Sequence, residues 1–339
     1  MVRTRHYLLR LFGRNYLLIF LPFFIIISLV FFVRISVLSS KIDLDAIELV
    51  KLFGYFVPEI VFFTIPVSFI AALANTFGKL SESNELTALF SLGHRPSSIL
   101  LHLLPVTILF STLLLVVSVF AFPQFKQKLS QFKREKIAQA TLNIQPNRLS
   151  QNFGNFHVFV ESKNGDKYGN IVLLNREKSG KYQLFIAKEG IVKNEKSLYS
   201  ISLVDGVGES SSDDKIQTLE YDRLTIYQYP HHKMKNLVDI GTYWLKALHD
   251  KGRMADLLYL IFVSLSPLLS FGPLMALSIY NPRYHSNRAP IAIFVTALMI
   301  YTPAALLQKY GNIPIFLALL TLFAFIDIYM IRYGIIKRY

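Results

Sequence analysis

Six long apolar segments, three before and three after one polar stretch, constrain the fold of this chain most strongly. Each has about 18 residues or more, so a helix built from it would span the roughly 30 Å hydrocarbon core of a bilayer. We therefore expect an α-helical integral membrane protein with six transmembrane helices (3+3) and one folded domain inserted between spans three and four. The segments are residues 16–33, 55–77, 99–122, 257–279, 289–307 and 313–331.

Composition supports a membrane location. Apolar residues make up 53% of the chain and its mean hydropathy is +0.40, which is high for a soluble protein. The first apolar segment is longer than the core of roughly 7–15 residues of a secretory signal and lacks a small-residue cleavage site, so we expect a retained helix. The chain has no cysteine, which excludes disulfides, thiolate metal sites and cysteine nucleophiles.

The distribution of Lys and Arg among the short loops predicts the orientation. With six spans, eleven basic residues fall on the side of the two termini and the second and fourth loops, and four fall on the other side. Short loops rich in Lys and Arg remain in the cytoplasm, whereas long domains cross regardless of charge. We expect a multi-pass protein of the bacterial inner membrane with cytoplasmic N- and C-termini and a periplasmic polar domain.

The polar domain should begin with a helix and continue with strands. Phe125, Leu129 and Phe132 recur at helical spacing, which predicts an amphipathic helix leading out of span three, and residues 233–253 look helical again. Between them, runs rich in β-branched and aromatic residues alternate with turn-forming stretches, which favours an all-β sandwich or jelly-roll-like domain. The predicted strands are residues 155–161, 170–174, 182–187, 198–203 and 218–227. The predicted domains are residues 1–122, 123–253 and 254–339.

The sequence carries no recognisable catalytic, metal or nucleotide site. The histidine pair 231–232 and the acidic pair 213–214 lack further ligands at the required spacing. Gly78-Lys79 resembles the end of a phosphate loop, but Leu80 stands where Ser or Thr is required. We expect no cofactor and no bond chemistry in this chain; if ATP drives it, another chain binds the ATP. The basic excess of the polar domain fits anionic lipid headgroups better than nucleic acid, although solubility explains it equally.

A few charged residues lie inside or at the ends of the spans, where charge is costly. Arg34, at the outer end of span one, and Lys41 after it have two interpretations: cations reaching the headgroup level, or a clamp for the phosphates of a lipid entering from the outer leaflet. Glu59, near the outer end of span two, either pairs locally or takes part in function. Asp327, near the cytoplasmic end of span six, is expected to pair with Arg332.

The second loop has the most specific local pattern. It predicts a short helix over about residues 81–93, begun by a serine cap and ended by Gly93. Two acidic residues fall in its first turn, where the helix dipole favours negative charge, and three apolar residues share one face. Either this is an ordinary interfacial helix, or it docks in a groove of a partner. The residues are Ser81 or Ser83 at the cap, Glu82 and Glu85 in the first turn, and Leu86, Leu89 and Phe90 on the apolar face.

Several short motifs accompany this layout. They are Val57-Pro58-Glu59, Gly78-Lys79-Leu80 with Asn84-Glu85-Leu86 and Gly93, and Asn281-Pro282-Arg283. With them the chain resembles the LptF/LptG permeases of the lipopolysaccharide exporter. The resemblance covers the whole chain; it is strong in the architecture and the second loop and weak in the exterior domain. The first and last motifs favour the LptF side of the family.

The resemblance implies the membrane half of an ABC transporter that extracts lipopolysaccharide from the outer leaflet of the inner membrane. This chain and a second, LptG-like six-span permease would enclose a cavity entered between spans one and five. An LptB-like ATPase dimer would use the ATP and contact the second loop at Glu85 and its neighbours. Arg34, with Lys41, would meet lipid phosphates, although Phe31 replaces a second base that some members have. The ATPase-coupling residues would be Glu85, Glu82, Leu86, Leu89 and Phe90.

The same resemblance implies that the jelly-roll-like domain passes the lipid to a periplasmic LptC/LptA-like bridge by pairing sheet edges. The competing interpretation is a non-transport membrane sensor or assembly scaffold whose outer β domain binds envelope ligands. A third interpretation is a permease for another lipid or for a lipoprotein. Hydropathy and charge fit all three, and only the second loop and the resemblance favour lipopolysaccharide export.

Overall fold

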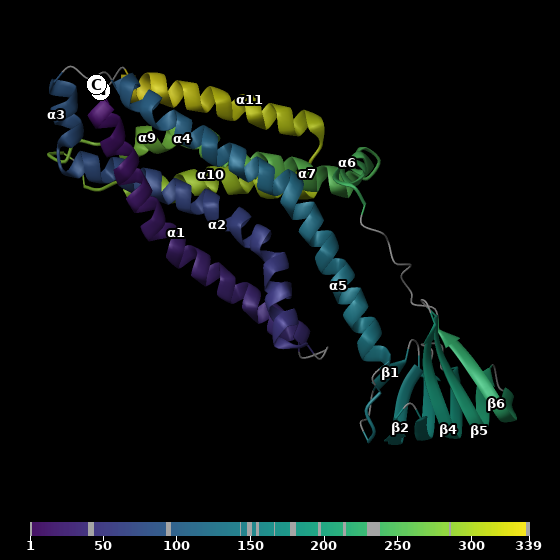
Figure 1. The fold of residues 1–339 in the computed structure, drawn as a ribbon. Coiled ribbons are helices and arrows are strands. Elements are labelled where there is room, and N and C mark those ends of the chain that lie inside the picture. Colours follow the sequence, from purple (N-terminus) through teal and green to yellow (C-terminus); the bar gives the residue numbers. More distant parts are fainter. Residues whose placement is uncertain are drawn as a thin grey trace. The chain divides into compact units, whose positions relative to one another are not determined.

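The computed structural model describes residues 2–39, 44–92, 96–142, 144–147, 151–153, 156–165, 167–176, 181–195, 198–212, 215–228, 238–284 and 286–336. They form two compact units, a helical one and a β one (Figure 1). The β unit consists mainly of residues 129–236, whereas residues 123–128 and 237–253, which were predicted from the sequence to belong to the same domain, group with the helical unit.

The helical unit contains the six predicted spans. Among the described residues, five helices are long and apolar enough to cross a membrane by themselves, and a bent pair of helices makes six when it is counted as one span. This confirms the helical part of the predicted fold class. The spans are α1 (Val2–Ser39), α2 (Ala46–Glu82), α4 (Pro96–Val116) with the π-helix η1 (Val117–Ala121) and α5 (Phe122–Leu142), α7 (Lys251–Ser264) with α8 (Ser266–Leu269) and α9 (Phe271–Ser278), α10 (Ala289–Tyr310), and α11 (Ile313–Tyr329) with the π-helix η3 (Met330–Ile336).

The fourth span is broken, and a side chain of the sixth span supports the break. Its two halves are bent by 54°, near Pro267, which interrupts the backbone hydrogen bonds of a helix. Beyond the break, Asp327 Oδ1 accepts a hydrogen bond of 2.6 Å from the Gly272 backbone N–H. A Cβ at Gly272 would lie 2.6 Å from the same oxygen, so only glycine fits. The expected pairing of Asp327 with Arg332 is therefore replaced by this backbone contact.

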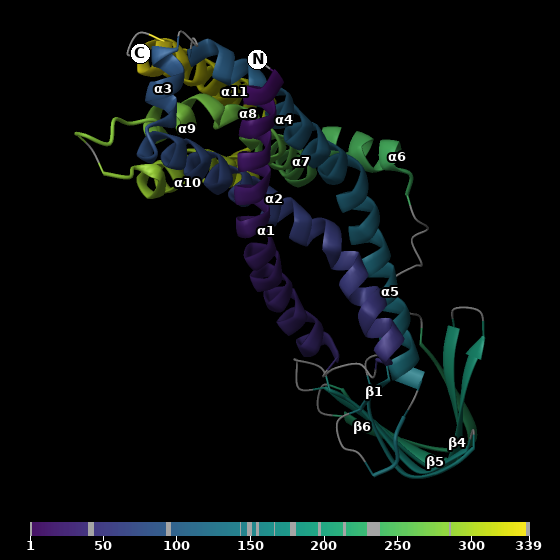
Figure 2. The same cartoon turned by 60° about the vertical axis from the view of Figure 1, so that its left-hand side comes forward.

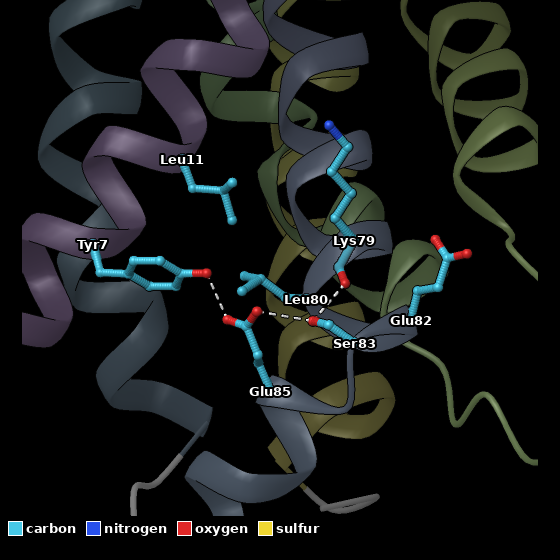
Figure 3. Close-up of a pocket in the computed structure, with 7 residues that line it drawn as sticks. All are labelled: Tyr7, Leu11, Lys79, Leu80, Glu82, Ser83 and Glu85. Atoms are coloured by element: carbon cyan, nitrogen blue, oxygen red, sulfur yellow. Dashed lines mark hydrogen bonds between the residues drawn. The ribbon is translucent and has the colours of Figure 1, made fainter.

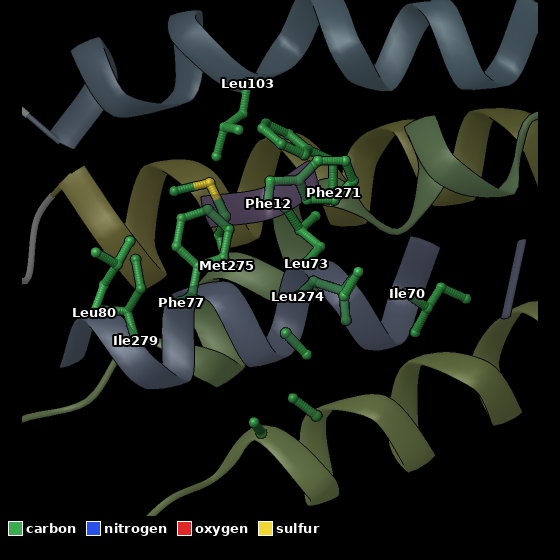
Figure 4. Close-up of a cluster of buried hydrophobic side chains, with 14 of the residues drawn as sticks. Phe12, Ile70, Leu73, Phe77, Leu80, Leu103, Phe271, Leu274, Met275 and Ile279 are labelled. Atoms are coloured by element: carbon green, nitrogen blue, oxygen red, sulfur yellow. The ribbon is translucent and has the colours of Figure 1, made fainter. Parts of the chain in front are cut away.

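Span two forms the centre of the helical unit. Of its most apolar stretch, 72% is buried, compared with 6% in α1 and in α11. One buried cluster combines Phe77 of α2 with Phe12 of α1, Leu103 of α4 and Met275 of α9 (Figure 4). A second cluster surrounds Phe62 and Phe262. Because α1 and α11 bury so little in this chain, their apolar faces remain for lipid or for another protein.

The chain between the β unit and span four is fastened to span three. The helix expected over 233–253 is divided into α6 (Ile240–Leu245), the 3-10 turn η2 (Lys246–Leu248) and the start of α7; residues 229–237 lie outside the described ranges. Trp244 Nε1 donates a hydrogen bond of 2.9 Å to the Val119 carbonyl in η1, where the wide turn leaves a carbonyl available. The side-chain amide of Gln127 bonds both the N–H and the C=O of Val238.

The β unit is an antiparallel sheet whose described strands follow in sequence order, β1-β2-β3-β4-β5-β6. This confirms the all-β domain of the predicted fold class. The connectivity is that of successive hairpins within one sheet, not of two separate sheets. The strands are β1 (Gln151–Phe153), β2 (Phe156–Asn164), β3 (Lys167–Arg176), β4 (Tyr182–Glu195), β5 (Leu198–Ser212) and β6 (Lys215–Gln228).

The sheet bends along one line across its strands (Figure 2). The β2–β3 ladder passes from Val160↔Ile171 to Ser162↔Gly169, and Asn170 between them has a positive φ of 49°. The buried residues of β3 are consequently three apart at this line, Tyr168 and Ile171, where regular alternation would separate them by two. Apolar side chains on both sides of the bend share one core. A single bent sheet thus encloses its own core, which gives the domain its jelly-roll-like character.

Candidate coupling and lipid-contact sites

The predicted short helix of the second loop exists, but it begins later than expected. Helix α2 continues to Glu82, and α3 (Glu85–Ser91) starts only after Asn84, whose φ of 58° is left-handed and ends the preceding helix. Ser81 is no cap: it is buried, and its Oγ accepts a hydrogen bond of 3.2 Å from the Tyr280 N–H. Of the two acidic residues expected in the first turn, only Glu85 belongs to α3. Gly93 lies outside the described residues.

The apolar stripe of α3 packs on its own chain. Leu86 is 2% exposed, and Leu89 and Phe90 are partly buried against the same cluster as Phe77 and Met275. The structure thus covers Leu86 with its own chain, and the predicted contact of these three residues with a partner stays a prediction. The sequence gives the periodicity of an apolar face but not the surface that covers it.

The face of α3 that is open to a partner is small and polar. Its members lie three to four residues apart, opposite the buried stripe, so the same periodicity could have identified them. The exposed residues are Asn84, Thr87, Ala88, Ser91 and Leu92.

Glu85 is held by residues of two other segments (Figure 3). Tyr7 Oη donates a hydrogen bond of 2.7 Å to Glu85 Oε2, and Ser83 Oγ lies 3.0 Å from Glu85 Oε1. Each carboxylate oxygen has two lone pairs, so the carboxylate can still accept a further donor from outside. The contact with Tyr7, from the beginning of α1, joins residues 78 positions apart and had no signal in the sequence.

A pocket of about 360 Å³ lies between the start of α1 and the end of α2, beside α3. On its α2 side, Lys79 Nζ donates a hydrogen bond of 2.9 Å to Asn15 Oδ1, and Asn15 Nδ2 donates one of 3.0 Å to Thr76 Oγ1. The lysine charge is thereby turned toward α1, and two carboxylates lie at the pocket. Its lining residues are Tyr7, Leu11, Lys79, Leu80, Glu82, Ser83 and Glu85.

Arg34, the candidate lipid-contact residue, already has two neighbours in the chain. Its Nη1 lies 3.8 Å from Glu59 Oε1, and its guanidinium lies 4.7 Å from the centre of the Phe31 ring. Phe31 in turn packs against Phe56 of α2 at 5.2 Å. The Arg34 side chain remains 59% exposed, so its charge is accessible. Lys41, the second expected contact, lies outside the described residues.

Two comparisons with known proteins bear on this arrangement. A family model described as "Lipopolysaccharide export system permease LptF/LptG" matches residues 6–333, nearly the whole chain. The match therefore includes both helical clusters, the β unit, the α3 site and Arg34. No curated protein matches the chain. Among the residues that the structure describes, no group of three His, Asp or Glu is placed to hold a metal ion.

Proposed function

The chain belongs to the LptF/LptG family of lipopolysaccharide export permeases, and we propose that it is the LptF-like subunit of an ABC transporter that extracts lipopolysaccharide from the inner membrane. In this role it moves lipid without making or breaking bonds. A separate ATPase supplies the energy, because the chain carries no phosphate-binding loop. A second, LptG-like permease completes the membrane channel.

In the proposed orientation, both termini and α3 face the cytoplasm and the β unit faces the periplasm. The excess of Lys and Arg in the short loops on the α3 side supports this orientation. The start of α1, the end of η3 and α3 lie at one end of the helical unit, as Figure 2 illustrates. An ATPase below the membrane would meet all three.

The single observation that carries the energy-coupling proposal is the preorganised carboxylate of Glu85. The Tyr7 hydroxyl donates to one of its oxygens, and the Ser83 hydroxyl, whose single proton is shared with the Lys79 carbonyl, lies beside the other. The adjacent exposed face of α3 is free of bulky apolar residues except Leu92. A fixed acid beside a shallow polar face suits an ATPase surface that presents a cation, because little ordering entropy is lost on binding. Glu82, exposed at the end of α2, lies close enough to share the pocket.

The proposed lipid path follows the exposed side of α1. Beyond its first turns, this helix presents a run of apolar residues more than half exposed, and α10 (span five) presents another. Acyl chains between two such permeases would contact these faces, while Arg34 at the outer end of α1 would meet phosphate. The exposed residues are Leu17, Leu18, Leu21, Ile25, Ile26, Leu29 and Val30 in α1, and Ile291, Phe294 and Leu298 in α10.

For delivery, we infer that a periplasmic LptC/LptA-like bridge extends the sheet. The outermost described strands are β1 and β6. Strand β6 has 14 residues, whereas β1 has only three, so β6 offers far more unpaired backbone for an added strand. The apolar core of the bent sheet would receive the acyl chains.

The test of this function is purification of the full chain from its native membrane, followed by mass spectrometry of bound protein and lipid. We expect a soluble ABC ATPase, a second six-span permease and lipopolysaccharide. A sensor or scaffold would retain periplasmic proteins but no ATPase. A permease for another cargo would retain the ATPase with a different lipid, and either result would contradict the proposal.

A further inference from the structure

Helix α1 contacts its own chain near both of its ends. Leu8 and Phe12 are buried near its start, and Phe31 and Ile35 are buried near its outer end, where Phe31 packs on Phe56 of α2. Most of the apolar residues between them, from Leu17 to Val30, are exposed. Tyr7 bonds Glu85 of α3, and Asn15 bonds Lys79 and Thr76 of α2. The ring contacts and the ion pair at the outer end of α1 reach the outer part of α2, so movement of this end would carry that part of α2 with it.

Two of these contacts reach different elements from one face of α1. Tyr7, Leu11 and Asn15 are spaced four residues apart, so they lie one above the other on the same side of the helix. Asn15 connects this face to α2, the central helix of the unit. Tyr7 connects it to α3, which is only seven residues long and follows a left-handed turn. A displacement of α3 would therefore pull α1 at Tyr7 while Asn15 remains near its pivot.

The part of α1 just beyond Asn15 is stiffened by aromatic side chains. Ring centres are 6.0 Å apart for Phe12 and Tyr16, 5.3 Å for Tyr16 and Phe20, and 5.7 Å for Phe20 and Phe24. This ladder spans Pro22, which removes one backbone hydrogen bond and would otherwise weaken the helix. A movement applied at Tyr7 would then be carried along α1 toward its opposite end, where Arg34 lies.

We propose that Tyr7 is a positioning residue that transmits movement of α3 to α1. The inference rests on the proposed contact between α3 and an ATPase. Glu85 can accept a donor from the ATPase and keep the Tyr7 hydroxyl, because its two oxygens offer separate lone pairs. Nucleotide-driven movement of the ATPase displaces Glu85, Tyr7 follows Glu85, and the outer half of α1, together with the outer part of α2 that it contacts, moves relative to α4. Lipid entry along α1 is thereby linked to ATP use.

The experiment compares Tyr7→Phe with wild type in the complete complex of this chain, the second permease and the ATPase. Tyr16→Phe is the matched control, since it removes a hydroxyl from the aromatic ladder of the same helix, away from Glu85. The absence of native cysteine allows spin labels on cysteines that replace Val33 in α1 and Leu109 in α4, both exposed. The label–label distance is measured without nucleotide and with ATP and vanadate, alongside lipopolysaccharide released per ATP hydrolysed.

We expect the distance to change on trapping in wild type and in Tyr16→Phe, and to change much less in Tyr7→Phe. Tyr7→Phe should still bind the ATPase and hydrolyse ATP, but release at least about tenfold less lipid per ATP, the scale of one lost hydrogen bond to a charged group. Three results would overturn this inference and leave the proposed function standing. They are a Tyr7→Phe variant that behaves like wild type, a Tyr16→Phe variant that loses as much lipid release as Tyr7→Phe, and a label–label distance that stays constant in wild type while lipid is released. Failure of the wild-type chain to bind the ATPase would overturn the proposed function itself.

Discussion

Glu85→Ala should release the ATPase from this chain. Truncating one member of a hydrogen-bonded charge pair in an interface costs about 2–5 kcal/mol, so the Kd should rise at least about 30-fold. Part of that loss comes from the partner cation, which is left without its carboxylate. Part comes from α3, which loses the bonds of Tyr7 and Ser83 that fix its first turn. The measurement is binding of the purified ATPase to the permease pair in detergent, with growth of a strain that depends on the variant.

Two companion variants separate charge from hydrogen bonding. Glu85→Gln retains an acceptor for Tyr7 and should lie between wild type and alanine. Glu82→Ala removes an exposed carboxylate three residues away, and an exposed charge contributes about 0–1 kcal/mol, so binding should weaken about fivefold or less. If Glu85→Ala binds the ATPase as well as Glu82→Ala does and supports growth, Glu85 has no coupling role.

Arg34→Glu should remove the lipid-phosphate contact at the outer end of α1. A hydrogen bond between charged groups contributes about 1.5–3 kcal/mol, and reversal adds repulsion, so capture of lipopolysaccharide should fall at least about tenfold. Stacking on Phe31 presents the guanidinium plane in a fixed place, which a phosphate can use bidentately. The measurement is photocrosslinking to lipopolysaccharide from a photoreactive residue at the exposed position Val33.

Glu59→Gln provides a control, because it should not lower the crosslinking that Arg34→Glu is expected to lower. It frees Arg34 from its 3.8 Å ion pair, so crosslinking should be retained or rise. If Arg34 only reaches the headgroups, Arg34→Glu will leave crosslinking unaltered. An equal loss in both variants would assign the pair to structure and contradict a direct phosphate contact.

The spans were predictable because the bilayer fixes both their length and their composition. The break in span four was only partly predictable. Pro267 indicated it, but the bond from Gly272 to Asp327 joins residues 55 positions apart, and no local pattern carries that information. The nearest charged neighbour in sequence, Arg332, was therefore the wrong partner to expect. Contacts between spans depend on packing that hydropathy does not record.

The β unit shows how composition can misplace a turn. Residues 209–212 are polar and lie between the predicted strands 198–203 and 218–227, yet they belong to β5 and pair with β4, for example Ser210 with Gln183. Polar residues are tolerated in a strand wherever its surface meets solvent. The bend of the sheet was also hidden, because a positive φ at Asn170 or Asp205 leaves no reliable signature in residue type.

At the candidate coupling site, the sequence predicted a short helix, which the structure contains as α3, and the coupling role of Glu85 stays a prediction. The apolar stripe led to the expectation of a partner groove, whereas Leu86 is buried in the chain's own core. Tyr7 could not be found, because nothing near residue 7 points to residue 85. The structure thus adds two contacts of α3: Leu86 packs in the core of the helical unit, and Glu85 accepts a hydrogen bond from Tyr7 of α1.

The most direct test of the account is ATP-driven transfer of lipopolysaccharide from proteoliposomes. The liposomes hold this chain with the second permease and the ATPase, and a soluble periplasmic acceptor protein is added outside. We predict transfer that requires ATP and is abolished by a catalytically inactive ATPase, while liposomes without this chain transfer nothing. Transfer that proceeds equally without this chain, or an assembled complex that hydrolyses ATP and moves no lipopolysaccharide, would contradict it.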